Sequence, residues 1–174
     1  MGQLAGDRTL EGKVAIITGA GGGLGRCHAL ELARHGARVV VNDLAEDACA
    51  QVVGEIRESG GEAMAAAGSV TDEQAVAAMV AGAIDRWGRV DILVNNAGIL
   101  RDKSFAKMDL ADFRAVVDVH LMGAAICTKA VWAPMREQGH GRIVMTTSSS
   151  GLYGNFGQAN YGAAKMALVG LMQT

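Results

Sequence analysis

Tyr161 and Lys165 stand four residues apart in a segment that predicts the start of a helix. Side chains at this spacing share one helical face, so the lysine ammonium can lie beside the tyrosine ring. A phenol ordinarily titrates at roughly pH 10, and a neighbouring fixed cation favours the phenolate and lowers that pKa. The pair predicts a tyrosine that acts as an acid or base near neutrality, with a surface tyrosine beside a solvated lysine as the alternative.

A glycine run follows the first aliphatic segment and opens a helical pattern. Residues 18–25 read Thr-Gly-Ala-Gly-Gly-Gly-Leu-Gly. Glycines permit a tight turn there, and bare backbone can approach a pyrophosphate that lies on the helix N-terminus. A flexible loop is the alternative, but the strand–turn–helix context favours a dinucleotide site.

Asp43 ends the second aliphatic segment. A carboxylate at this position accepts hydrogen bonds from the adenosine ribose and repels a 2′-phosphate, which favours NAD over NADP. Asn42 beside it could soften that preference. A second role is compatible with the first, because Asp43 could also cap a helix that starts at Ala45.

The elements that must position these groups alternate between strand and helix patterns. Strands are predicted at residues 14–18, 38–42, 62–66, 91–94 and 142–146. Apolar runs without alternation, such as residues 39–41, are typical of strands covered on both faces. The order predicts an α/β fold, a doubly wound parallel sheet of Rossmann type, in which Pro134 ends the long helix before the last strand.

The candidate groups follow the carboxyl ends of separate strands. The glycine run follows the first strand, Asp43 the second, residues 95–98 (Asn-Asn-Ala-Gly) the fourth and Ser148 the fifth. In open parallel sheets ligands bind along this edge, at the switch point between the first and fourth strands. The amide pair could brace the adjacent strand or contact a cofactor, with an Asx turn as the alternative. Four such signals at one edge predict a nucleotide site.

Composition excludes several classes of function. The chain has 174 residues and a formal net charge of -2, so it offers no basic surface for nucleic acid or an anionic membrane. No apolar run approaches the roughly 20 residues of a membrane span, and residues 1–11 form a polar lead-in without a secretory signal. Cys27, Cys49 and Cys127 are scattered, so we expect small buried thiols, no metal site and a reducing, cytoplasmic location.

Together, the motifs at residues 18–25, 95–98 and 161–165 resemble the short-chain dehydrogenase/reductase family over residues 12–174. More narrowly, residues 95–105 (NNAGILRDKSF) and 151–161 (GLYGNFGQANY) resemble the (3R)-hydroxyacyl-CoA dehydrogenase domains of peroxisomal type 2 multifunctional enzymes, also described as 17β-hydroxysteroid dehydrogenases. The second stretch also occurs in 3-oxoacyl-carrier-protein reductases. The resemblance implies hydride transfer between NAD and a secondary alcohol or ketone, with a 3-hydroxyacyl thioester or a steroid as substrate.

The resemblance also implies a role for each matching residue. Tyr161 would exchange a proton with the substrate oxygen, Ser148 would hold that oxygen, and Lys165 would lower the pKa of Tyr161 and bind the nicotinamide ribose. His120 stands where the family usually has an asparagine for a proton-relay water, so it is either a relay residue or a packed helix histidine. The implied cofactor-binding residues are Gly19, Gly22, Gly23, Leu24, Gly25, Asp43, Ser69, Val70, Asn96, Ala97, Gly98, Tyr161 and Lys165.

Length sets one further expectation. Single α/β domains of this family run to roughly 250 residues, so we expect a chain that is incomplete at its C-terminus and lacks the last strands and the substrate lid. The implied partners are a small-molecule substrate and further copies of the chain, as a homodimer or homotetramer paired through helices at residues 110–132 and from 159 onward. A non-catalytic, NAD-binding or oligomer-forming fragment is the alternative from a different class of function.

Overall fold

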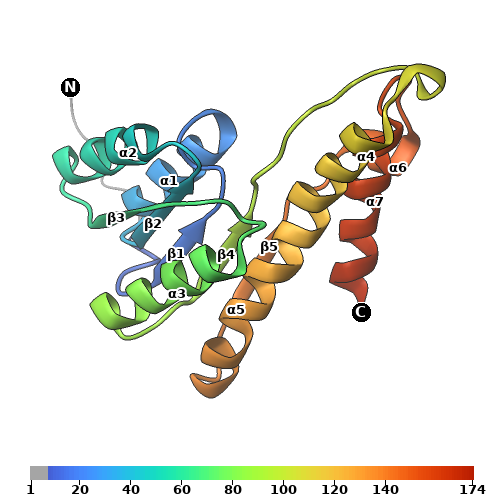
Figure 1. Ribbon diagram of the computed structural model, residues 1–174. Coiled ribbons are helices and arrows are strands. Elements are labelled where there is room, and N and C mark those ends of the chain that lie inside the picture. The colour runs from blue at the N-terminus through green and yellow to red at the C-terminus, as the bar shows by residue number, and fades with distance from the viewer. Residues whose placement is uncertain (1–7) are drawn as a thin grey trace.

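The computed structural model describes residues 8–174, so residues 1–7 of the predicted lead-in lie outside the described part of the chain. Five parallel strands form one sheet in the order β3-β2-β1-β4-β5 (Figure 1). They are β1 (Val14–Ile17), β2 (Arg38–Asp43), β3 (Ala63–Ala67), β4 (Ile92–Asn95) and β5 (Arg142–Met145). Each lies within one residue of its predicted ends, and the order confirms the doubly wound sheet with its switch point between β1 and β4.

Helices cover both faces of the sheet. The four that do so are α1 (Gly23–Arg34), α2 (Glu46–Glu58), α3 (Glu73–Trp87) and α5 (Gly123–Glu137). Ala15 and Ile17 of β1 belong to the core shared with α1 and α2, whereas Val14 and Ile16 belong to the core shared with α3 and α5. Successive side chains of a strand point to opposite faces, so a strand buried on both sides is apolar throughout.

One long helical run crosses the sheet on the α3 side. It follows a short 3₁₀ turn, η1 (Phe105–Lys107), and consists of α4 (Leu110–Val117), a π-helical turn η2 (Asp118–Met122) and α5. The prediction that Pro134 ends this run is wrong, because the helix continues to Glu137. The proline ring removes only its own N–H donor, and its carbonyl still accepts the N–H of Gln138 at 3.0 Å.

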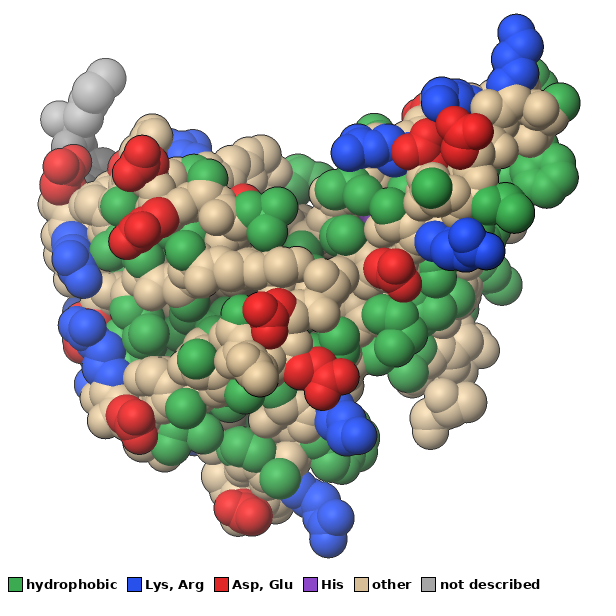
Figure 2. Space-filling model, viewed as in Figure 1, with side chains coloured by type: hydrophobic (Ala, Val, Ile, Leu, Met, Phe, Trp, Pro, Cys, Tyr) green, Lys and Arg blue, Asp and Glu red, His purple; other side chains and the backbone are tan. Residues whose placement is uncertain are grey.

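The surface of this run is apolar in part. By length and composition, Leu110–Glu137 is the one helix among residues 8–174 that could cross a membrane, and 33% of its apolar window is buried. Core helices of soluble proteins meet the same test. On the face shown in Figure 2, acidic and basic side chains are interspersed and form no continuous basic area.

Beyond β5 the chain forms two helices that bring the C-terminal motif to the sheet. They are α6 (Ser149–Tyr153) and α7 (Ala159–Gln173), and α7 packs against α4, α6 and η2 (Figure 1). β5 lies at the edge of the sheet in the described chain, and its Val144 side chain is 48% exposed.

A buried carboxylate joins the amino ends of β1 and β4. Asp91 is fully buried; it accepts the backbone N–H of Val14 at 3.0 Å and ion pairs from Arg89 at 2.6 Å and Lys13 at 3.3 Å. Burial opposes ionisation of Asp91, but Arg89 and the Val14 N–H outweigh it and lower its pKa. The charge therefore stabilises the end of the sheet opposite the candidate site.

The cysteines are all free, but only two follow the sequence prediction. Cys49 and Cys127 are buried, and burial raises the pKa of the Cys127 thiol to about 12. The expectation of burial is wrong for Cys27, which is exposed on α1. Its neighbours in sequence explain this, because Gly25 and Ala29 form the buried face of that helix.

Candidate active site

The glycine turn leaves β1 at the carboxyl edge of the sheet and packs against the end of β4. Gly19 has a left-handed φ of +63°, and a Cβ there would lie 2.8 Å from the Cα of Ala97. A Cβ on Gly25 would overlap the carbonyl oxygen of Gly19 and lie 2.7 Å from Nδ2 of Asn96. These two glycines therefore let strand, turn and helix approach each other closely.

The N-terminus of α1 is open to an anion. Gly22 caps it without a side-chain hydrogen bond, and no acidic residue lies in the first turn. Nothing lies within 4 Å of the positions where Cβ atoms of Gly22 and Gly23 would be. Free backbone N–H groups and the helix dipole favour negative charge at such an end, so the turn fits a pyrophosphate.

Asp43 lies beside this turn rather than on the next helix. Its Oδ2 accepts the N–H of Gly21 at 2.9 Å, and its Oδ1 accepts the N–H of Leu44 at 2.7 Å. The suggested cap role is wrong, because α2 begins at Glu46 with Ala45 as an N-cap that makes no side-chain bond. The carboxylate is fixed by backbone donors at the edge of the sheet, where it can still accept bonds from ribose hydroxyls.

The amide of Asn96 braces the turn, which is one of the roles that the sequence left open. Its Nδ2 donates to the carbonyl oxygens of Thr18 at 3.0 Å and Gly19 at 3.2 Å. Thr18 is the reciprocal brace: its buried Oγ1 accepts the N–H groups of Asn96 and Ala97, both at 3.0 Å. The only sign of this role of Thr18 in the sequence is a hydroxyl at the end of a buried strand, and the role was not predicted.

Asn42 has a structural role, and its suggested effect on cofactor choice stays a prediction. Its Nδ2 donates to the carbonyl oxygens of Ala66 at 2.8 Å and Gly68 at 3.1 Å, and so holds the end of β3 to β2. Ser69 follows that end and is bonded through Oγ to the N–H of Thr71 at 3.2 Å.

These residues surround a cleft of about 210 Å³ along the carboxyl edge of the sheet. It is lined by Gly19, Asn42, Asp43, Leu44, Gly68, Ser69, Val70, Asn96, Ala97, Gly98, Ile99 and Val119. The lining contains predicted residues at or after the ends of β1, β2, β3 and β4, whereas Ser148, which follows β5, does not line it. Gly22 and Gly23 lie at the open start of α1, and Leu24 is 68% exposed there.

Tyr161 and Lys165 lie on the first turns of α7, as the sequence predicts. The lysine Nζ is 5.5 Å from the centroid of the tyrosine ring and donates to the carbonyl oxygen of Thr146 at 2.5 Å. Lys165 is only 3% exposed, and burial lowers its pKa to about 8. The ammonium form still predominates at neutral pH, so the tyrosine has a cation beside it.

Ser148 reaches this region because α6 packs tightly on α7. It caps α6, and its Oγ accepts the N–H of Ser150 at 3.2 Å. A Cβ on Gly151 would lie 2.9 Å from the Cβ of Lys165, so only a glycine allows this approach of the two helices. Ser148 therefore lies at the start of a closely packed pair of helices, and Lys165 lies on the second helix of that pair.

His120 is packed inside the helical run, as one of the two suggested roles requires, and it also lies against Tyr161. The side chain is 4% exposed in the π-helical turn, and its ring meets that of Tyr161 edge to face with centroids 5.2 Å apart. Its Nε2 lies 3.0 Å from the nitrogen and 2.9 Å from the oxygen of Ile99. Burial, with a smaller effect from Lys165, lowers the pKa of His120, so the ring is neutral at physiological pH.

Asn160 is a further site residue that the sequence analysis missed. It is fully buried, its Nδ2 donates to the carbonyl oxygen of Arg101 at 3.0 Å, and its Oδ1 accepts the N–H of Tyr161 at 2.7 Å. It thereby connects the segment after β4 to the start of α7. A long-range contact of this kind leaves no pattern in the sequence.

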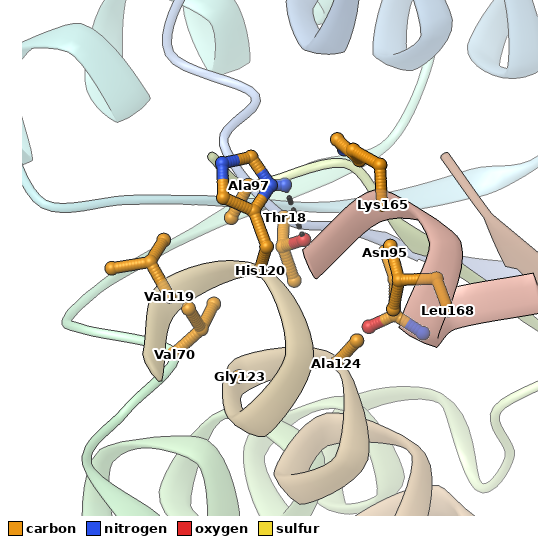
Figure 3. A pocket seen from close by; sticks show the side chains of 10 residues that line it. All are labelled: Thr18, Val70, Asn95, Ala97, Val119, His120, Gly123, Ala124, Lys165 and Leu168. Carbon is orange, nitrogen blue, oxygen red and sulfur yellow. Dashed lines mark hydrogen bonds between the residues drawn. The ribbon is translucent and has the colours of Figure 1, made fainter. Parts of the chain in front are cut away.

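A second, smaller cavity lies beside the cleft and reaches the α7 residues (Figure 3). Val70, Ala97 and Val119 line both spaces, and Lys165 and His120 line the smaller one. Two of the residues predicted to act on a substrate, Lys165 and His120, thus adjoin the cofactor cleft, whereas Tyr161 and Ser148 line neither space.

Known proteins share the sequence features of this site. A model of the short chain dehydrogenases matches residues 13–174. The peroxisomal multifunctional enzyme type 2 of Drosophila melanogaster is 54% identical over 173 residues, which are 94% of this chain and 28% of that protein. The 3-oxoacyl-[acyl-carrier-protein] reductase of Synechocystis sp. is 45% identical over 166 residues, which are 95% of this chain and 67% of that protein.

Among solved structures, a 7α-hydroxysteroid dehydrogenase complexed with NADH and 7-oxo glycochenodeoxycholic acid superposes with a TM-score of 0.90. It is 38% identical, and the match covers 98% of this chain and 66% of that one. The chain therefore spans little more than a quarter of the multifunctional relative and about two-thirds of the other two proteins.

Proposed function

The chain belongs to the short-chain dehydrogenase family, and from this premise we propose that it carries the nicotinamide-binding and catalytic groups of an oxidoreductase. The reaction interconverts a secondary alcohol and a ketone. One observation carries the proposal most directly: the cleft beside the glycine turn continues, through shared lining residues, to the cavity lined by Lys165 and His120.

The residues present fit a dinucleotide. The open N-terminus of α1 suits a pyrophosphate, and the glycines of the turn leave the space that side chains would fill. Ser69, Val70 and residues 96–98 line the adenosine side of the cleft. When bound, a nicotinamide supplies the acceptor or donor of the hydride.

We assign NAD rather than NADP on the basis of Asp43. Its carboxylate lines the cleft and is held by the N–H groups of Gly21 and Leu44. A fixed negative charge there accepts ribose hydroxyls and repels a 2′-phosphate.

The catalytic groups follow from the geometry of α6, α7 and η2. Tyr161 gives a proton to, or takes one from, the substrate oxygen, and the Nζ of Lys165 lies 5.5 Å from the centroid of its ring. Ser148 donates a hydrogen bond to the same oxygen and holds the substrate in place. His120, neutral and in contact with the Tyr161 ring, passes protons between Tyr161 and the interior.

For the substrate we propose a 3-hydroxyacyl thioester. The names of the multifunctional and 3-oxoacyl-carrier-protein relatives support an acyl chain on a thioester, whereas the name of the structural neighbour supports a steroid. A 3-oxoacyl-carrier-protein substrate and a hydroxysteroid are therefore the alternatives that a substrate panel must include.

The test is direct. Purified protein with NAD and a 3-hydroxyacyl-CoA should generate NADH absorbance, and Tyr161→Phe should lower kcat by about 10²–10⁴-fold while NAD binding, followed by calorimetry, is retained. A Tyr161→Phe variant as active as the wild type would overturn the catalytic assignment. Activity only with a hydroxysteroid or a carrier-protein thioester would show that the proposed substrate is wrong, but it would not contradict the proposed mechanism.

A second function, association of copies of the chain, is supported by the exposed apolar side chains of the long helix. Met122 is 47% exposed and Trp132 is 57% exposed, and Met166 on α7 is 49% exposed. We propose a homodimer or homotetramer paired through these helices, to be tested by light scattering of wild type and Trp132→Glu. The cytoplasmic location stays a prediction from the cysteine pattern.

A further inference from the structure

Asn160 is a fully buried polar side chain directly before Tyr161 on α7. Both ends of its amide are occupied: Nδ2 donates to the carbonyl oxygen of Arg101 at 3.0 Å, and Oδ1 accepts the N–H of Tyr161 at 2.7 Å. A carbonyl oxygen only accepts and a backbone N–H only donates, so one orientation of the amide satisfies both partners. The side chain is therefore held from two sides in a single arrangement.

One of these bonds acts on the backbone of Tyr161 itself. Tyr161 is the third residue of α7, and the first N–H groups of a helix have no carbonyl partner within it. The N-cap, Gln158, uses its side chain elsewhere, because its Nε2 donates to Asp102 at 2.8 Å. Asn160 thus takes the place of a cap and fixes the backbone from which the tyrosine ring extends.

The other bond ties α7 to the irregular segment of residues 99–103, which leaves the end of β4 and runs toward the start of α7 (Figure 1). The nitrogen and oxygen of Ile99, in the same segment, lie 3.0 Å and 2.9 Å from Nε2 of His120. One piece of backbone therefore holds two neighbouring rings, His120 through Ile99 and Tyr161 through Asn160.

This segment also borders the proposed cofactor cleft, because Gly98 and Ile99 line it. We propose that Asn160 is a positioning residue, which sets where Tyr161 stands relative to His120 and to this wall of the cleft. The inference rests on the proposed catalytic role of Tyr161. Position matters to the rate because a displacement of about 1 Å in an active site can cost about 100-fold.

Burial distinguishes this tie from a neighbouring one between the same two segments. The bond from Gln158 to Asp102 is exposed, so water can replace either partner when it is lost. The bond from Asn160 to Arg101 is shielded, and without it the carbonyl oxygen and the N–H of Tyr161 both lose a partner that water does not readily supply. The start of α7 must then shift to satisfy them.

Asn160→Leu tests the proposal, because leucine has nearly the same shape but no polar atom. We expect the single-turnover rate of NADH formation to fall by about 10–100-fold, with the affinity for NAD, measured by calorimetry, unchanged. The cross-relaxation signal between the ring protons of Tyr161 and His120, whose centroids lie 5.2 Å apart in the wild type, should be lost. Asp102→Ala, the matched control, removes the exposed tie and should keep both the rate and the ring signal.

A purely structural role predicts a different result. It lowers the melting temperature of Asn160→Leu but leaves the rate and the ring signal of the folded protein as in the wild type. Either a wild-type rate or an intact ring signal in this variant overturns the proposal. Weakened NAD binding also overturns it, because the effect would then extend to the cleft as a whole.

A measurement on the wild type decides the matter if Asn160→Leu does not fold. The side-chain NH₂ protons of Asn160 should exchange with solvent far more slowly than those of Asn155, which is exposed in the loop before α7. Equal exchange at the two residues overturns the proposal. A wild type that turns over no substrate refutes the proposed function, and the ring signal and amide exchange then still decide whether Asn160 positions Tyr161.

Discussion

Gly25→Ala tests how closely the turn, β4 and α1 are packed. The added Cβ would overlap the Gly19 carbonyl and lie 2.7 Å from Nδ2 of Asn96, which itself bonds the carbonyls of Thr18 and Gly19. Overpacking costs about 1–3 kcal/mol, and two weakened hydrogen bonds cost about 1 kcal/mol each. Alanine stabilises a helix by about 1 kcal/mol relative to glycine, which offsets part of this loss. We expect a net loss of about 2–4 kcal/mol in the free energy of unfolding.

Urea unfolding followed by circular dichroism measures this loss, and two other glycines serve as controls. Gly54→Ala lies in the middle of α2 with nothing within 4 Å of its added Cβ, so it should raise the free energy of unfolding by up to about 1 kcal/mol. Gly22→Ala has equal space and an extended φ of -166°, so it should unfold like the wild type but bind NAD more weakly, because its Cβ occupies the proposed pyrophosphate position. A Gly25→Ala protein as stable as the wild type would refute the packing argument.

Three further predictions concern charge. Asp91→Asn should lower the free energy of unfolding by about 1–3 kcal/mol at neutral pH. Because the folded pKa of Asp91 is lowered, this difference from the wild type is present above the unfolded pKa of about 4. It should vanish as the pH falls through the lower folded value in acid unfolding scans. Lys165 is the opposite case: its folded pKa of about 8 lies below the ordinary 10.5, so the unfolded chain binds more protons between these values. Wild type should therefore gain stability relative to Lys165→Met by up to about 1.4 kcal/mol per pH unit from pH 8 upward in thermal unfolding, and a flat difference would contradict the burial of the ammonium. Asp43→Ser should raise the ratio of NADP to NAD affinity by at least about tenfold, roughly 1.4 kcal/mol, in calorimetric titrations, and an unchanged ratio would remove Asp43 from cofactor choice.

Much of the fold was predictable because it depends on local patterns. Short apolar runs without alternation can be satisfied only by strands covered on both faces, and all five predicted strands are present. The carboxyl ends of parallel strands share one edge, so the meeting of the glycine turn, Asp43 and residues 96–98 at one cleft also followed from the order of elements. The spacing of Tyr161 and Lys165 predicted their common face, which the structure confirms.

The errors share a physical cause. The sequence also suggests that Asp43 caps a helix, because a sequence does not say which backbone groups lie across from a side chain. In the structure the N–H of Gly21 binds the carboxylate instead. The sequence predicts a helix end at Pro134 because proline commonly ends helices, but in the structure the helix continues through it.

The sequence by itself determined the order of the strands and helices, the edge at which the predicted cofactor residues meet and the family, since each depends on residue type and spacing along the chain. Only the tertiary structure decided which polar groups face each other: Thr18 against Asn96, Asn160 against Arg101, and Asn95 and His120 around one small cavity. Those partners are distant in sequence, and a hydrogen bond depends on the distance and direction between two atoms. Neither quantity exists until the chain has folded.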